Sequence, residues 1–270
     1  MPDLSPDQRP DGWSAGAAGY LAEFAPHTEP YAADMADALA VVAGDRVLDV
    51  AAGTGSFTLT AARRGADVVA TDFAPGMVGV LADLLAAEGL PGRAEQADGQ
   101  ALTHADDSFD VACSMFGLMF FPDTSAGLRQ LGRVVRPGGR VGVGTWELQG
   151  FGLQHAIRAA LAEALDGFTP PGPPVWAPLG EVEGLRSAMA AAGLTDIEVR
   201  RVTRSWRFDD PAGFFRRFPG WSPPIQAMFE QVDPAVLDTA AAAFGGVVEQ
   251  LADESGGLPN SALLATATVT

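Results

Sequence analysis

The segment VLDVAAGTGSF, residues 47–57, constrains the fold of this chain more than any other stretch. It opens with a short apolar run typical of a buried strand, continues with small residues, and reaches Ser56, a residue type that often caps a helix. Gly53 and Gly55 let the backbone approach a ligand closely, and the first turn of a helix offers unpaired N–H groups. The pattern predicts a strand, a binding loop and a helix in succession.

The alternation of strands and helices continues through the first half of the chain. Strand patterns cover residues 46–51, 66–72, 93–98, 109–116 and 140–146, and helical patterns lie between them at 56–64, 75–88 and 124–135. Five strands that alternate with helices predict an α/β fold with a parallel, doubly wound sheet.

The remaining segments are less regular. The first 11 residues are polar and proline-rich and predict a disordered lead, and residues 13–42 have helical spacing. The second half predicts helices at 151–165 and 181–192, a proline-rich loop at 169–178, an aromatic-rich helical stretch at 211–252, and β-rich segments at 195–208 and 262–270. Because no repeat or linker interrupts the chain, residues 1–270 are interpreted as one domain.

The charge balance and the cysteine content exclude several classes of protein. With 34 acidic and 17 basic residues, the net charge is −17, which disfavours nucleic-acid and membrane-surface partners. Cys113 is the only cysteine, so an intrachain disulfide is excluded. The N-terminus lacks a signal-peptide pattern, and no apolar run reaches the ~20 residues of a membrane span. We therefore expect a cytoplasmic protein that acts on a small molecule, with a homodimer as a compatible assembly.

Three features of the binding loop narrow its ligand. Asp49 precedes the glycines, where its charge would repel a pyrophosphate but attract a cationic amine. Thr58 stands where dinucleotide-binding loops have a third glycine. Asp72 ends the second strand, where a carboxylate can accept both hydroxyls of a ribose. These features disfavour an NAD-dependent oxidoreductase.

Five segments in order over residues 45–147 resemble class I S-adenosylmethionine-dependent methyltransferases, especially the quinone-biosynthesis type: VLDVAAGTG, VVATDFAPGMV, EQADGQAL, FDVACSMFGLMFFPD and RVVRPGGRVGVGTW. The resemblance implies a Rossmann-like sheet of seven strands whose last strand, at 262–270, runs antiparallel beside 195–208. It also implies an N-terminal helical lid (1–42), a cofactor-binding core (43–147) and a helical cap inserted at 211–252. Ala51 departs mildly from the many members that have glycine there.

The resemblance also implies roles for individual residues toward S-adenosylmethionine. Asp49 would orient the amino-acid end, with Ala51, Gly53 and Gly55 lining the methionine and ribose. Asp72 would hold the ribose hydroxyls. The other implied cofactor residues are Phe73, Met77, Asp98, Gly99 and Gln100 around the adenine, Ser114 and Met115 under the sulfonium, and Tyr20 on the lid. Core packing is the alternative for Met77, Met115 and Tyr20, and a turn or helix cap is the alternative for the three aspartates. No metal site is expected.

The acceptor side is expected at the carboxyl edge of the sheet, between the N-terminal helix and residues 211–252, because ligands of open α/β folds bind there. His155 and His27 are the candidate bases if the acceptor must lose a proton, whereas His104 is interpreted as a solvated loop residue. Nine aromatic residues are candidates for lining an apolar acceptor pocket, with core packing as their alternative role: Phe116, Phe120, Phe121, Trp146, Phe151, Trp176, Trp206, Trp221 and Phe229.

The leading hypothesis is transfer of a methyl group from S-adenosylmethionine to O, N or C of a small, apolar or aromatic molecule. One alternative keeps the fold and the cofactor but catalyses a non-methylating reaction such as cyclisation. A second alternative is a module that senses the cofactor without turnover, which the large aromatic cap disfavours.

Overall fold

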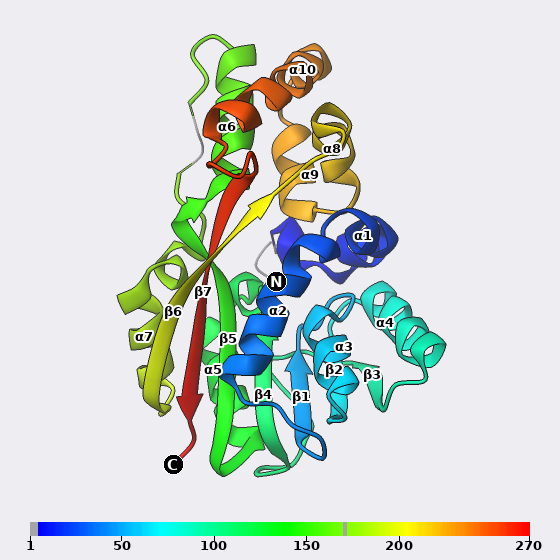
Figure 1. The fold of residues 1–270 in the computed structure, drawn as a ribbon, viewed down its shortest axis with the longest axis vertical. Coiled ribbons are helices and arrows are strands. Elements are labelled where there is room, and N and C mark those ends of the chain that lie inside the picture. The colour runs from blue at the N-terminus through cyan, green and yellow to red at the C-terminus, as the bar shows by residue number, and fades with distance from the viewer. Residues whose placement is uncertain (1–4, 170–171) are drawn as a thin grey trace.

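The computed structural model describes residues 5–169 and 172–270 and contains the predicted seven-stranded sheet (Figure 1). The strand order is β3-β2-β1-β4-β5-β7-β6. The strands are β1 (Arg46–Val50), β2 (Asp67–Asp72), β3 (Gly92–Gln96), β4 (Phe109–Met115), β5 (Val135–Phe151), β6 (Thr195–Trp206) and β7 (Leu258–Thr268). Strands β1 to β5 pair in parallel, and β7 is antiparallel to both β5 and β6, as predicted.

Helices pack against the central strands, which explains why those strands are almost wholly apolar. In β1, only Arg46 is exposed, because both faces of a central parallel strand are covered. The helices of the sheet region are α2 (Ala25–Ala38), α3 (Ser56–Arg63), α4 (Pro75–Glu88), α5 (Thr124–Val134) and α7 (Val182–Ala191). Helix α2 approaches β5 closely: a Cβ on Gly142 would lie 2.9 Å from Sδ of Met35.

The N-terminal region is helical, as its spacing predicts, but it is ordered further toward the start of the chain than expected. Two helices, α1 (Pro10–Glu23) and α2, meet at Phe24. Pro26 explains the break between them, because it has no N–H to donate to the preceding turn and its ring clashes there. The expected disordered lead is wrong where the structure describes it, since Pro6–Gln8 forms a short 3-10 helix, η1, and α1 starts at Pro10. Residues 1–4 of that lead lie outside the described residues.

Four helices form a cap beyond the carboxyl edge of the sheet, in the upper part of Figure 1: α6 (Gly152–Ala164), α8 (Pro211–Arg217), α9 (Pro223–Phe229) and α10 (Pro234–Leu251). The cap was predicted from residues 211–252 alone. Helix α6 belongs to it because β5, at 17 residues, runs past β4 and delivers α6 against α10. Within the described residues, none of the helices combines the length and the apolar character that crossing a membrane requires.

Candidate active site

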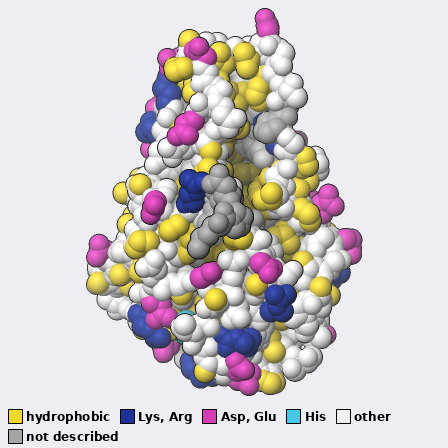
Figure 2. Space-filling model, turned by 180° about the vertical axis from the view of Figure 1, so that it is seen from behind, with side chains coloured by type: hydrophobic (Ala, Val, Ile, Leu, Met, Phe, Trp, Pro, Cys, Tyr) yellow, Lys and Arg dark blue, Asp and Glu magenta, His cyan; other side chains and the backbone are white. Residues whose placement is uncertain are grey.

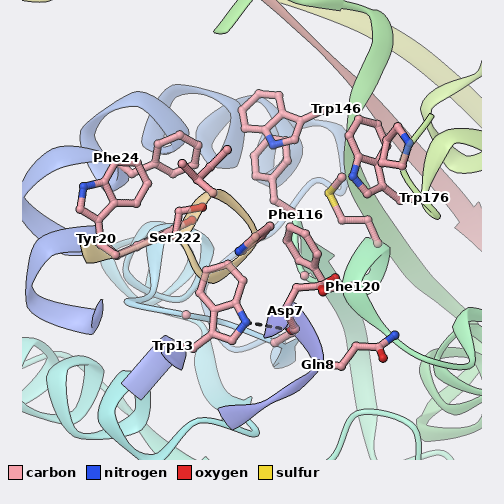
Figure 3. A pocket seen from close by; sticks show the side chains of 18 of the residues that line it. Asp7, Gln8, Trp13, Tyr20, Phe24, Phe116, Phe120, Trp146, Trp176 and Ser222 are labelled. Atoms are coloured by element: carbon pink, nitrogen blue, oxygen red, sulfur yellow. Dashed lines mark hydrogen bonds between the residues drawn. The ribbon is translucent and has the colours of Figure 1, made fainter. Parts of the chain in front are cut away.

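A cavity of about 1210 Å³ lies between the carboxyl ends of the parallel strands and the cap. Figure 2 shows a hollow between the upper and lower parts of the molecule with hydrophobic side chains around it, and Figure 3 shows the aromatic side chains that surround the cavity. Its volume of about 1210 Å³ exceeds the ~300–1,000 Å³ typical of a pocket for one small molecule. The cavity therefore has room for two ligands side by side.

Asp49, near the end of β1, supplies a buried carboxylate at the sheet end of the cavity. Its Oδ2 accepts a hydrogen bond from Thr58 Oγ1 at 2.6 Å, whereas its Oδ1 is buried and has no partner among the described residues. Burial raises the pKa of Asp49 to about 7. Because an unsatisfied buried acceptor is costly, this oxygen fits a ligand that brings a cationic donor.

Asp72 ends β2 and connects the binding loop to the start of the next helix. Its Oδ2 accepts from Gly53 N at 2.8 Å and its Oδ1 accepts from Ala74 N at 2.9 Å. Burial raises the pKa of Asp72 to about 6, against the lowering effect of these backbone donors. Each oxygen keeps acceptor capacity that can serve the adjacent hydroxyls of a ribose.

The loop between Asp49 and α3 leaves space for a ligand at Gly53. Its φ is +56°, and a Cβ at this position would find no atom within 4 Å. Ala51 also has a φ of +56°, a conformation that an alanine adopts only at a cost, which explains why glycine suits this position. Both residues line the cavity.

Gly55 and Ser114 differ from their predicted roles, since neither is among the residues that line the cavity. Gly55, at φ +96°, serves packing: a Cβ there would lie 2.2 Å from Cδ1 of Leu81 on α4. Ser114 is fully buried and accepts a hydrogen bond from Leu118 N at 3.1 Å. Side chains alternate along a strand, so the next residue, Met115, reaches the cavity instead.

All the residues predicted to surround the adenine line the cavity: Phe73, Met77, Asp98, Gly99 and Gln100. Asp98 Oδ1 accepts from the backbone N of Gln100 at 2.9 Å and from its Nε2 at 3.0 Å. Gln100 Oε1 in turn accepts from Asp123 N at 2.8 Å. This chain of hydrogen bonds holds the loop after β3 in place.

Tyr20 on α1, the residue predicted to act as a lid, lines the cavity near Asp72. Burial, together with the negative charge of Asp72, raises the pKa of the Tyr20 phenol well above its usual value. Its ring makes edge contacts with Trp13 and Trp221, at centroid distances of 6.3 and 6.1 Å. Trp13 Nε1 donates to the backbone oxygen of Asp7 at 2.9 Å, as drawn in Figure 3.

The segment at residues 7–10 is therefore part of the cavity wall, which the sequence interpretation missed. Asp7, Gln8 and Pro10 all line the cavity. The sequence does contain a sign of order in this segment: Pro6 and Pro10 each begin a helix, and proline is favoured in the first turn of a helix.

The cap end of the cavity is aromatic. Phe116 stacks on Trp146 at 4.0 Å, and Phe151 stacks on the same indole at 4.5 Å. Of the nine aromatic candidates, all line the cavity except two, Trp206 and Phe229, which belong to the buried core. This wall suits a flat, apolar ligand.

The two histidines proposed as bases do not line the main cavity, nor does His104. The His27 ring is stacked on Trp206 at 4.5 Å, and burial lowers the pKa of its imidazole. His155 lines a small neighbouring recess and not the main cavity. His104 contacts Glu95 at 2.8 Å, with its side chain only 11% exposed, so it is not a solvated loop residue. The location of His27 and His155 does not support a role as general base.

Comparisons with known proteins agree with this arrangement. Residues 47–139 match the family model described as a methyltransferase domain. An uncharacterised protein of Mycobacterium tuberculosis (strain ATCC 25618 / H37Rv) is 34% identical over 228 residues, which cover 83% of this chain and 81% of that protein. The demethylmenaquinone methyltransferase of Corynebacterium kroppenstedtii is 45% identical over 100 residues, which cover 37% of this chain and 41% of that enzyme.

The fold also has a counterpart among solved structures. The Haemonchus contortus phosphoethanolamine N-methyltransferase 2 in complex with S-adenosyl-L-methionine superposes with a TM-score of 0.55 at 16% sequence identity. The match covers 89% of this chain and 53% of that one. At this identity, the likeness concerns the fold.

Proposed function

This chain belongs to the class I S-adenosylmethionine-dependent methyltransferases, and from that premise we propose that it transfers a methyl group to O, N or C of a small aromatic or apolar acceptor. The observation that carries the proposal is that one cavity has two chemically different sides. One side presents carboxylates and an open glycine loop, and the other presents stacked aromatic rings.

The residues at the sheet end fit S-adenosylmethionine. The unpaired Oδ1 of Asp49 would accept from the ammonium of its amino-acid end, with Gly53 leaving room beside it. Asp72 would hold the ribose hydroxyls, and the loop at Asp98 would receive the adenine. The bound cofactor supplies an electrophilic methyl group on a sulfonium.

The residues of the cap end position the acceptor and exclude water. Trp146, Phe116 and Phe151 form a stacked wall, and Phe24 extends it, with its ring 6.2 Å from that of Trp146 and 5.1 Å from that of Trp221. In this enclosure, orientation of the two reactants supplies much of the rate. Since no histidine lines the described cavity, the acceptor atom is expected to be nucleophilic already, as in a phenolate, an enolate or an arylamine.

The test combines a binding measurement with a turnover measurement. Calorimetry with S-adenosylmethionine, S-adenosylhomocysteine and NAD establishes which cofactor binds. Incubation with methyl-labelled S-adenosylmethionine and a panel of phenols, quinols and arylamines then measures label transfer. Tight binding of S-adenosylmethionine with transfer to one class supports the proposal. Binding without transfer to any class favours the non-methylating alternative, and preferential binding of NAD contradicts the proposal.

A further inference from the structure

Arg158 is the single basic residue among the described residues that line the cavity, where the acidic residues are Asp7, Asp49, Asp72 and Asp98. It lies on α6, one turn after Gln154, so both side chains lie on the helix face that borders the cavity. Figure 1 places α6 in the cap, away from β1 and β2, which carry Asp49 and Asp72. Three of the carboxylates, Asp49, Asp72 and Asp98, therefore lie toward the sheet and the guanidinium lies toward the cap, whereas Asp7 lies on η1, which packs against the cap helix α9.

The guanidinium of Arg158 has no ion pair or hydrogen bond with any described residue. This is unusual in a chain with 34 acidic and 17 basic residues, where Arg133, Arg140 and Arg204 all contact carboxylates. Arg158 is also partly buried, beside Ile157 and Leu153 on the cavity side of the same helix. A partly buried cation in an apolar wall gains most from an anionic partner, because water screens the interaction less there.

Polar groups accompany Arg158 at this corner. A second recess of about 260 Å³ shares Gln154 and Arg158 with the main cavity and is also lined by Gln149 and His155. The Nε2 atom of His155 is buried and has no partner among the described residues. The corner thus gathers amide and imidazole groups around one guanidinium, the type of set that binds an oxyanion.

We propose that Arg158 binds an anionic group of the acceptor, so that the substrate class is an aromatic or apolar acid. The proposal rests on the proposed methyl transfer and specifies its acceptor. A guanidinium pairs with a carboxylate through two parallel hydrogen bonds, which fixes orientation as well as affinity. The carboxylates at the sheet end repel the same anionic group. The acceptor then enters with its acidic end toward the cap and its other end toward the transferred methyl.

Two fluorescent dyes with one ring system test the proposal without turnover. The first is 1-anilinonaphthalene-8-sulfonate, and the second is N-phenyl-1-naphthylamine, which lacks the sulfonate. Both are titrated into protein saturated with S-adenosylhomocysteine, so that the cofactor end is filled. Arg158→Gln should weaken binding of the sulfonated dye by about tenfold or more, as expected for hydrogen bonds to a charged group, and leave the neutral dye within about twofold.

Two further variants control for charge and for folding. Arg200→Gln removes the same charge from the exposed face of β6, outside the cavity, and should change neither dye. Arg158→Lys keeps the charge and should retain most of the binding of the sulfonated dye. Three results would overturn the proposal. Arg158→Gln could weaken binding of both dyes equally, or Arg200→Gln could weaken binding of the sulfonated dye as much as Arg158→Gln does. The wild type could also bind the sulfonated dye no more tightly than the neutral one. Calorimetry with S-adenosylmethionine on the same variants reports separately on the cofactor end, so failure here is distinct from failure of the proposed function.

Discussion

At the scale of single residues, the two carboxylates at the sheet end are held in different ways. Both oxygens of Asp72 accept from backbone N–H groups, one from Gly53 in the binding loop and one from Ala74 just before α4. Asp49 has one oxygen paired with Thr58 and one with no partner. We infer that Asp72 organises the site in addition to holding the ribose, whereas Asp49 is left for the ligand.

Replacement of Asp72 by alanine is expected to weaken binding of S-adenosylhomocysteine by about 1.5–3 kcal/mol, the range for hydrogen bonds to a charged group. Asp72→Asn keeps one carbonyl acceptor for the Gly53 or Ala74 N–H and should lose less. Isothermal titration calorimetry measures both. An affinity of Asp72→Ala within a factor of two of the wild type would rule out the ribose assignment.

Cofactor affinity is expected to fall as the pH falls from 8 to 5.5. The raised pKa of Asp49, about 7, means that the free site is protonated below neutrality and must release that proton to receive an ammonium group. The loss should approach about tenfold per pH unit once the pH is below 7, and become steeper near 6, where Asp72 titrates. Asp49→Asn should bind weakly at pH 8 and lose the part of the dependence that begins near pH 7, so that only the fall near pH 6, where Asp72 titrates, remains. An unchanged profile in that variant would assign the titration to another group.

At the scale of elements, the lid helix α1 depends on close contact with α4. A Cβ on Gly76 would lie 2.4 Å from the backbone O of Ser14 and 2.6 Å from its Cα. Gly76→Ala should therefore displace α1 and lower the free energy of unfolding by about 1–3 kcal/mol, as overpacking does. Because α1 carries Tyr20, cofactor affinity should fall as well. Denaturant unfolding and calorimetry measure the two effects.

Gly79 on the same helix is the matched control. A Cβ there meets nothing within 4 Å, so Gly79→Ala should stabilise the protein by up to about 1 kcal/mol through helix propensity alone. Equal effects of the two substitutions would show that α1 does not rest on α4 as described.

Some of these elements could be predicted from the sequence alone, and others could not. Strands β1, β2 and β4 could be predicted, as could the positions of Asp49 near the end of β1 and Gly53 in the loop after it, because short-range patterns specify them. The cavity wall at Asp7 and Gln8 was not, because a polar, proline-rich lead gains order only by packing on elements remote in sequence. The sequence places His155 just after β5 and so suggests that it lies near the carboxyl edge of the sheet. Its position on α6 directs the side chain into a separate recess, and this direction could not be read from the sequence.

At the scale of the whole molecule, the cap and the sheet share their strands. β5 and β7 pair along both parts, with Phe151 opposite Asn260 at the cap end and Arg140 opposite Thr268 at the other. Asn260 is fully buried and joins three elements: its backbone O accepts from Tyr31 on α2 at 2.7 Å, and its Oδ1 accepts from Leu153 N on α6 at 2.8 Å. The cap is therefore not expected to unfold separately from the sheet.

We expect thermal unfolding in a single transition that S-adenosylhomocysteine shifts upward as a whole. A ligand at 100 times its Kd stabilises the native state by ~2.7 kcal/mol, and one kcal/mol raises Tm by ~2–4 °C in a chain of about this size. The ligand should thus raise Tm by about 5–10 °C. Differential scanning calorimetry measures this shift. Intrinsic tryptophan fluorescence reports on the unfolding of both the sheet and the cap, since Trp146 lies on β5 and Trp221 lies in the cap, and both line the cavity. Asp72→Ala at the same ligand concentration should show a smaller shift. Two separate transitions, or a ligand shift confined to one of them, would mean that the cap folds independently, so that the aromatic end of the cavity could open while the cofactor end stays intact.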